Sequence, residues 1–291
     1  MNTNKSKILI LITAALIIAV GFAVVRTILV INYYDVEEGL YQVNATGVTA
    51  TRIAFGVSLV LLGVASFFTF KKRKFEKMPE SNHGVVFTAS LCGFMYISSG
   101  ALISYYFLPS LFKAVFGSGK SLSAYIKSDD GINVLLLIML LLAVIFSLVS
   151  ALYYFWCAST TTKLKKLNYR LLSMMPVLWA VFYLVYMYFN KDTVINSPER
   201  SVMQLSVVAV MIYFTSEARF HFGIANNRVY TAISLMTVTA IIFACAPRFI
   251  LTAFWVMPFS TDTVYAVLQL ALAVYIIFRL LSVSCAKEEE N

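Results

Sequence analysis

Eight apolar stretches follow one another along the chain, separated by short polar segments. They cover residues 8–30, 53–70, 85–107, 132–156, 171–189, 201–218, 229–246 and 264–283. A helix rises about 1.5 Å per residue, so about 20 residues cross the roughly 30 Å hydrocarbon layer of a bilayer. The alternating ten-residue segments typical of transmembrane β-barrels do not appear. The pattern predicts an all-α polytopic transmembrane helical bundle of about eight spans.

Composition supports this prediction and leaves no room for a soluble unit. Hydrophobic residues make up 60% of the chain and charged residues 13%, and the mean hydropathy is +0.81. Soluble domains carry about 25% charged residues, so a water-soluble globule is excluded. We therefore expect residues 1–291 to form a single integral membrane domain with the lipid bilayer as its partner. Protein partners and oligomeric state stay open.

The net charge of +9 changes the picture only through its distribution. Basic residues gather after the second and fourth stretches, as KKRKFEK from residue 71 and KLKK from residue 163. Cytoplasmic loops collect Lys and Arg, so the pattern predicts that both termini are cytoplasmic (N-in, C-in). Nucleic-acid binding needs a basic face on a polar domain, and no stretch is long enough to form one.

Small residues and prolines distinguish individual spans. Gly93 and Gly100 share a face of the third span, which favours a place in the middle of the bundle; the alternative is a polar substrate path. Gly63 in the second span repeats this spacing with Gly56, so we expect the second and third spans to pack there. Pro176 predicts a kink in the fifth span. Pro247 predicts an early end of the seventh, with residues 247–260 interfacial or re-entrant, as in the broken helices of transporters.

Arg26 is the clearest charge inside an apolar stretch. It lies four residues before the end of the first span, roughly 6 Å from the outer edge at the helical rise. An arginine side chain can reach the interface over that distance, so we favour a snorkelling residue over a functional one.

The inner end of the sixth span, TSEARFHFGIANNR, contains the other candidate chemistry. Glu217 and His221 are four residues apart and share a helix face, which would suit a metal or proton-transfer pair. His83 is the only other histidine and the four cysteines are dispersed, so we expect no metal site and no cofactor. The favoured interpretation is a solvated, salt-bridged helix end formed by Glu217, Arg219 and His221.

The first outer loop, YYDVEEGLY, is acidic. Asp35, Glu37 and Glu38 precede Gly39, which offers a turn. Cation binding is one interpretation; an acidic outer loop that simply follows the topology is the favoured one.

The stretch FGSGKS at residues 116–121 resembles the end of a phosphate-binding P-loop. That motif requires a glycine five residues before the final one, and the residue there is Ala114. The topology also places the stretch in the outer loop between the third and fourth spans, away from cytoplasmic ATP. We therefore predict no nucleotide between Gly117 and Ser121.

Two segments resemble a family of uncharacterised multi-spanning membrane proteins of anaerobic Firmicutes. Members carry an Asp-x-x-x-Gly-aromatic element outside the first helix, which Asp35 and Gly39 match, although the aromatic Tyr41 comes one residue late. They also carry Glu-Ala-Arg-Phe at a later helix end, matched here from Glu217 to Phe220. The resemblance implies a multi-pass protein of the bacterial cytoplasmic membrane and no particular activity.

Three functions are compatible with these features. The favoured one is a non-enzymatic structural or accessory membrane component, because few charges are expected to be buried. A small-molecule transporter or permease is the first alternative and would need a polar cavity reaching the middle of the bilayer. An intramembrane enzyme using Glu217, His221 or the acidic outer loop is the second, although no HExxH or GxSxG motif is present.

Overall fold

The computed structural model describes residues 3–36, 38–42, 46–70, 74–75, 82–116, 131–159, 167–190 and 197–285. In these residues, eight helices are long and apolar enough to cross a membrane, which confirms the predicted all-α transmembrane bundle. They are α1 (Thr3–Tyr33), α2 (Thr46–Thr69), α3 (His83–Tyr106), α6 (Gly131–Ala158), α8 (Met175–Phe189), α9 (Pro198–His221), α10 (Asn227–Ala253) and α11 (Thr261–Cys285). Shorter elements are α4 (Leu108–Phe116), α7 (Leu167–Leu172), β1 (Tyr34–Asp35), β2 (Leu40–Tyr41), β3 (Lys74–Phe75) and β4 (Ala225–Asn226).

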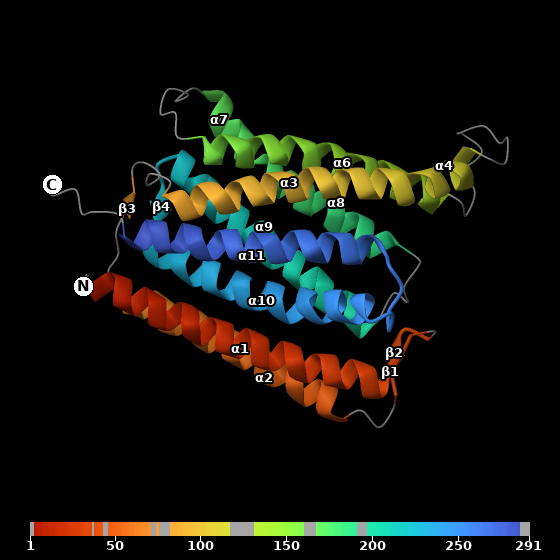
Figure 1. The fold of residues 1–291 in the computed structure, drawn as a ribbon, viewed down its shortest axis with the longest axis horizontal. Helices are drawn as coiled ribbons and strands as arrows, with labels where there is room; N and C mark the ends of the chain where they lie inside the picture. The colour runs from red at the N-terminus through yellow and green to blue at the C-terminus, as the bar shows by residue number, and fades with distance from the viewer. Residues whose placement is uncertain are drawn as a thin grey trace.

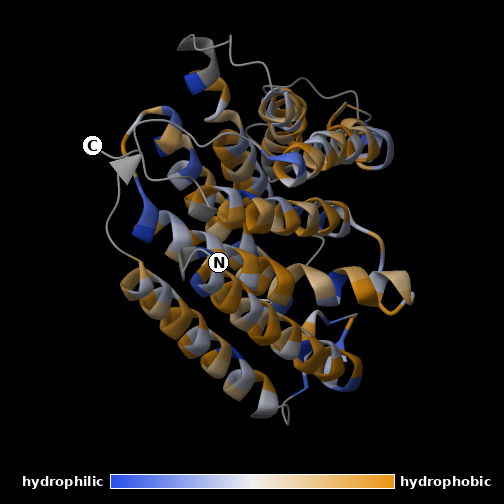
Figure 2. Ribbon diagram, turned by 60° about the vertical axis from the view of Figure 1, so that its left-hand side comes forward, coloured by the Kyte–Doolittle hydropathy of each residue, from blue (hydrophilic) through white to orange (hydrophobic). Residues whose placement is uncertain are grey.

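The first residues of α1 and the last residues of α11 lie at the same end of the bundle (Figure 1). We call this the inner end, following the orientation that the basic loops predict, and the opposite one the outer end. The hairpin β1–β2 lies at the outer end, and the pair β3–β4 lies at the inner end. Hydrophobic residues dominate along the helices between the two ends, as a bilayer requires (Figure 2).

Six of the long helices form a closed ring. α3 packs on α6, α6 on α8, α8 on α9, α9 on α10, α10 on α11, and α11 on α3. α1 and α2 lie outside this ring against α10, and they are the least buried spans (Figure 1). The most buried spans are α10 and α11, so the prediction that the third span occupies the middle of the bundle is wrong. The space enclosed by the ring is the lumen, and side chains fill it.

The small residues of α3 do allow close packing, with a different neighbour from the one expected. A methyl group on Gly93 would approach the ring of Phe155 on α6 to 2.9 Å, and Gly100 lies against Leu148 of the same helix. Gly63 of α2 lies against Met236 of α10 instead of α3. Bulky side chains of α6 and α10 occupy the space left at these glycines. Hydropathy alone does not identify which helix supplies them.

Both prolines behave differently from the prediction. Pro176 stands in the first turn of α8 and begins that helix after α7, where its missing N–H costs nothing. Pro247 lies inside α10, which continues to Ala253 instead of ending early. The turn that follows lies at the outer end, where Trp255 has φ 60° and a 93% exposed side chain. Residues 254–260 therefore connect α10 to α11 at the outer end of the bundle.

Candidate functional site

A column of aromatic rings fills the lumen. The centroid of Tyr275 on α11 lies 5.1 Å from that of Tyr154 on α6, Tyr154 lies 5.4 Å from Tyr96 on α3, and Tyr96 lies 5.2 Å from Trp179 on α8. All four side chains are fully buried. They come from four different helices of the ring, so side chains close the lumen where the helix backbones do not meet.

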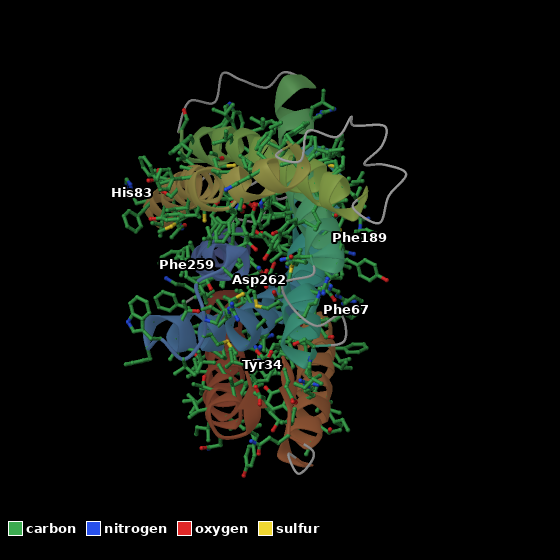
Figure 3. The ribbon with its side chains drawn as sticks, turned by 90° about the vertical axis from the view of Figure 1, so that its right-hand side faces the viewer. Tyr34, Phe67, His83, Phe189, Phe259 and Asp262 are labelled. Atoms are coloured by element: carbon green, nitrogen blue, oxygen red, sulfur yellow. The ribbon has the colours of Figure 1, made fainter. Side chains whose placement is uncertain are left out.

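The column continues towards the outer end. Trp179 lies 5.6 Å from Tyr265 of α11, and Tyr265 lies 3.8 Å from Tyr183 of α8. The hydroxyl of Tyr183 donates to Oδ1 of Asp262 at 3.0 Å. Figure 3 views the bundle from the outer end and places Asp262 inward of Phe189 and Phe259. The six rings of Tyr275, Tyr154, Tyr96, Trp179, Tyr265 and Tyr183 form what we call the aromatic column.

Several polar atoms along the column are buried without a hydrogen-bond partner. Among the described side chains they include the hydroxyls of Tyr96 and Tyr154 and the Oε2 atom of Glu217. Leaving such a group unsatisfied costs about 1–3 kcal/mol, and native proteins rarely leave several together. The lumen therefore offers donors and acceptors that water or a polar solute can satisfy.

The inner end of the column meets a buried charge cluster, which we call the inner cluster. Tyr275 donates to Oε1 of Glu217 at 2.6 Å, and Nε of Arg279 lies 3.8 Å from the same oxygen. Glu217 is 1% exposed and Arg279 is 2% exposed. Tyr213, one turn before Glu217 on α9, bonds the hydroxyl of Tyr230 on α10 at 3.1 Å. α9, α10 and α11 thus supply a polar end to the lumen.

This arrangement corrects the interpretation of TSEARFH as a solvated helix end. Of its three charged residues only Arg219 is exposed. His221 pairs with Tyr153 of α6, whose hydroxyl lies 3.2 Å from Nε2, and the partners of Glu217 are Tyr275 and Arg279. No group of three metal-binding side chains occurs in the residues that the structure describes.

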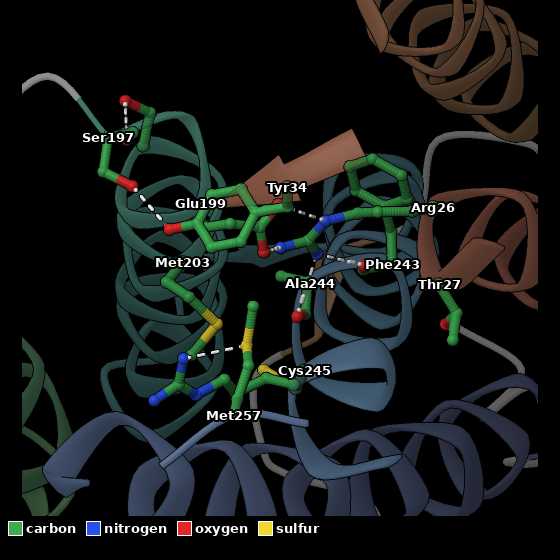
Figure 4. A network of polar contacts seen from close by, with 12 residues as sticks. Arg26, Thr27, Tyr34, Ser197, Glu199, Met203, Phe243, Ala244, Cys245 and Met257 are labelled. Atoms are coloured by element: carbon green, nitrogen blue, oxygen red, sulfur yellow. Dashed lines mark hydrogen bonds and ion pairs between the residues drawn. The ribbon is translucent and has the colours of Figure 1, made fainter. Parts of the chain in front are cut away.

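A second charge cluster, the outer cluster, lies near the opposite end of α9 (Figure 4). Arg26 of α1 forms an ion pair with Glu199, through Nη2 to Oε2 and through Nε to Oε1 at 3.4 Å. Tyr41 of β2 donates to Oε1 of Glu199 at 2.7 Å. Arg26 is only 3% exposed, so it does not snorkel to the interface as predicted. The paired carboxylate holds it inside the protein.

The outer hairpin covers this cluster. Tyr34 and Tyr41 face each other with ring centroids 5.1 Å apart, and the Tyr34 hydroxyl lies 3.3 Å from Oγ of Ser197. Burial raises the pKa of Tyr34 above its usual value. Burial and the Glu199 carboxylate raise that of Tyr41 even more strongly. Both phenols therefore remain protonated donors at neutral pH.

Asp35 shapes the turn of this hairpin. Its Oδ1 accepts from the backbone N–H of Glu38 at 3.2 Å, and its carbonyl accepts from Gly39, which has φ 69°. Glu37 lies outside the described residues, as do residues 117–121 with the predicted absence of nucleotide. The acidic loop is at the opposite end of the bundle from Glu217 and His221, so these groups do not converge on one catalytic centre.

Two hollows stand out in the described part of the chain. One of about 10 Å³ lies beside Arg26 and Tyr41, which is room for about one water molecule. A groove of about 190 Å³ runs between α9 and α10 beside Arg219. Neither is lined by a residue of the aromatic column.

Glu199, Arg279 and Tyr275 are members of the two clusters that the sequence did not single out. Arg279 lies inside the last apolar stretch, much as Arg26 lies inside the first, and it follows Tyr275 by four residues on the same helix face. Tyr213 and Glu217 repeat this spacing on α9. A tyrosine four residues before a charged residue inside a span is therefore the sequence pattern that could have identified the inner cluster.

No protein-family model, curated protein or solved structure matches this chain. The geometry of the lumen and its two charge clusters therefore carries the functional argument.

Proposed function

We propose that this chain is a small-molecule transporter whose path is the lumen of the six-helix ring, held closed here by the aromatic column. The observation that supports it is the set of buried polar atoms without partners in the lumen: the Tyr96 and Tyr154 hydroxyls and Oε2 of Glu217. A solid core would be filled by apolar side chains, because they pack without a desolvation cost.

The structural-component interpretation rests on few buried charges, and that premise fails. Among the described residues, five charged side chains are buried: Arg26, Glu199, Arg200, Glu217 and Arg279. Charged groups inside a membrane protein commonly mark ion or substrate pathways. The full burial of the column rings favours the structural role instead, so it stays the second candidate, and an experiment has to separate the two.

The resemblance and the basic loops support placing this transporter in a bacterial cytoplasmic membrane with both termini inside. Polar solutes are the substrate class that fits a lumen lined by hydroxyls and a carboxylate–guanidinium pair.

Cys92 is a native reporter for opening of the lumen. It is fully buried on α3, one turn before Tyr96, and its Sγ lies 3.5 Å from the carbonyl oxygen of Ala271 on α11. A variant that keeps Cys92 and replaces the other three cysteines by alanine is exposed, in membrane vesicles, to a permanently charged methanethiosulfonate reagent. The proposal predicts time-dependent labelling at Cys92, because an opening lumen admits water and the reagent.

The matched control is Phe94→Cys in a cysteine-free background. Phe94 is two residues from Cys92 and 62% exposed on the outside of α3, so a thiol there faces lipid and does not ionise. Labelling at Cys92 above this control supports transport. A Cys92 that reacts no faster than the control, yet reacts fully after denaturation in detergent, favours the structural role.

A further inference from the structure

The outer cluster surrounds the guanidinium of Arg26 with oxygen atoms from two helices, α9 and α10. Nη1 donates to the carbonyl oxygens of Phe243 at 2.6 Å and Ala244 at 2.9 Å, and the carboxylate of Glu199 holds Nη2 and Nε. The guanidinium carbon also lies 5.2 Å from the ring centroid of Phe243. Figure 4 shows these contacts converging on one buried cation.

Pro247 explains why a helix carbonyl is free for this role. In a regular helix the carbonyl of residue 243 accepts from the N–H of residue 247, and proline has no N–H. α10 nevertheless continues past Pro247 to Ala253. The carbonyl of Phe243 therefore lacks its helical donor, and Arg26 satisfies it from the neighbouring helix.

The carboxylate oxygens of Glu199 are also held in place around the guanidinium. Glu199 stands in the first turn of α9 and is 7% exposed, and its Oε1 also accepts from the Tyr41 hydroxyl at 2.7 Å. A carboxylate with peptide carbonyls is the ligand set that proteins offer to hard cations, and carbonyls freed by broken membrane helices do bind cations.

We propose that the outer cluster is a monovalent-cation site that the chain fills with its own Arg26, and that it binds a free guanidinium-type cation when the side chain of Arg26 is removed. The buried charge of Glu199 gives the vacated site its affinity, because an uncompensated carboxylate inside the protein is strongly unfavourable. The planar, multiply bonded contacts of Arg26 favour guanidinium over a spherical ion. The site is independent of whether a solute passes through the lumen.

The test is chemical rescue of Arg26→Ala in lipid nanodiscs. The melting temperature Tm of wild type and variant is measured in guanidinium, sodium, potassium or choline chloride at equal ionic strength and at concentrations too low to denature. We expect a saturable rise in the variant's Tm with guanidinium, of about 3–6 °C at about ten times its Kd, and no such rise in wild type. Choline has no hydrogen-bond donor on its charged nitrogen and should leave the Tm unchanged.

Two further variants assign the effect to these residues. The double variant Arg26→Ala with Glu199→Gln should lose the rescue, because the carboxylate that attracts the cation is gone. Arg279→Ala at the inner cluster is the matched control: it also removes an arginine buried beside a carboxylate, and no proline frees a carbonyl there. Its response to guanidinium should be weaker, because the carboxylate there attracts the cation without a freed carbonyl to bind it.

Arg26→Gln is the second variant if Arg26→Ala does not fold, since glutamine keeps a donor near the carbonyls and lacks the charge. The proposal would be overturned if guanidinium and choline changed the Tm equally in whichever of the two Arg26 variants folds. A larger response to sodium or potassium than to guanidinium would overturn the guanidinium preference. Cys92 labelling tests the lumen separately, so failure of the rescue leaves the transport proposal unaffected.

Discussion

The outer and inner clusters are built from the same three residue types and differ in how completely they are bonded. Each pairs a glutamate of α9 with an arginine and a tyrosine hydroxyl from elsewhere in the chain. Glu199 and Glu217 are 18 positions apart, which is five helical turns, so they lie on the same face and roughly 27 Å apart along the axis. α9 therefore carries one carboxylate near each of its ends.

The outer cluster is saturated. Arg26 reaches both oxygens of Glu199 and two backbone carbonyls. The ion pair of the inner cluster is looser, because Nε of Arg279 stays 3.8 Å from Oε1 of Glu217, beyond hydrogen-bond distance. This difference indicates that the outer cluster fixes α1, α9 and α10 together, whereas the transport proposal has the inner cluster exchange partners as the lumen opens.

The largest expected effect follows from removing the carboxylate of the saturated cluster. Glu199→Ala leaves Arg26 buried without its counter-ion, so the free energy of unfolding should fall by about 3–5 kcal/mol. Reversible unfolding in mixed micelles measures it. Glu38→Ala, at an exposed carboxylate of the same end, is the control and should leave stability unchanged. A loss below about 1 kcal/mol in Glu199→Ala would show that the outer cluster does not hold the bundle.

Removing one tyrosine hydroxyl from each cluster compares the two clusters directly. Tyr275→Phe should cost about 2–3 kcal/mol, because it removes the hydrogen bond that Glu217 receives at 2.6 Å. Tyr41→Phe should cost less, about 1–2 kcal/mol, since Glu199 keeps its bonds to Arg26. The same unfolding assay ranks them. The reverse order would mean that the inner carboxylate has support that the outer one lacks.

High pH should weaken the outer cluster through Tyr41. Its folded pKa is raised above the ordinary value of 10.0, so its contribution is complete below that pH and is lost as the pH rises above it. Stability should fall by at most about 1.4 kcal/mol per pH unit from this group. The free energy of unfolding, measured at increasing pH, should decline less steeply in Tyr41→Phe than in wild type. Identical slopes would show that Tyr41 does not cause the decline.

The smallest effect is expected at Pro247. Pro247→Ala restores an N–H that competes with Arg26 for the carbonyl of Phe243. A regular helix gains up to about 3 kcal/mol, while the lost bond to a charged group costs about 1.5–3 kcal/mol, so the net change should be small. Unfolding measures the net value, and guanidinium rescue in the background Arg26→Ala should weaken. Undiminished rescue would show that the freed carbonyl is not needed.

Hydropathy was sufficient to predict eight spans and their approximate bounds, because the cost of exposing polar backbone to lipid requires helices of this length. It could not assign neighbours. Gly63 lies against Met236 of α10 and Gly93 against Phe155 of α6, and both pairings depend on side-chain shape in three dimensions.

The charge clusters were only half visible in the sequence. Arg26 and Glu217 stood out by their positions, but their partners Glu199 and Arg279 are 173 and 62 residues away, where no local pattern links them. The rule that cytoplasmic loops collect Lys and Arg also counts every arginine near a span end as a loop charge. Arg279 was therefore counted with the loops, although it is buried on α11.

The central claim is that the aromatic column closes a lumen that can open, with the inner cluster holding α9 to α11 at its inner end, and the rate of Cys92 labelling tests it most directly. In the variant that retains only Cys92, Glu217→Gln removes the charge that attracts Arg279 and retains an acceptor for Tyr275. The account predicts faster labelling by the charged thiol reagent than with Glu217 in place, and no change at the lipid-facing control Phe94→Cys. An unchanged rate at Cys92 would contradict it.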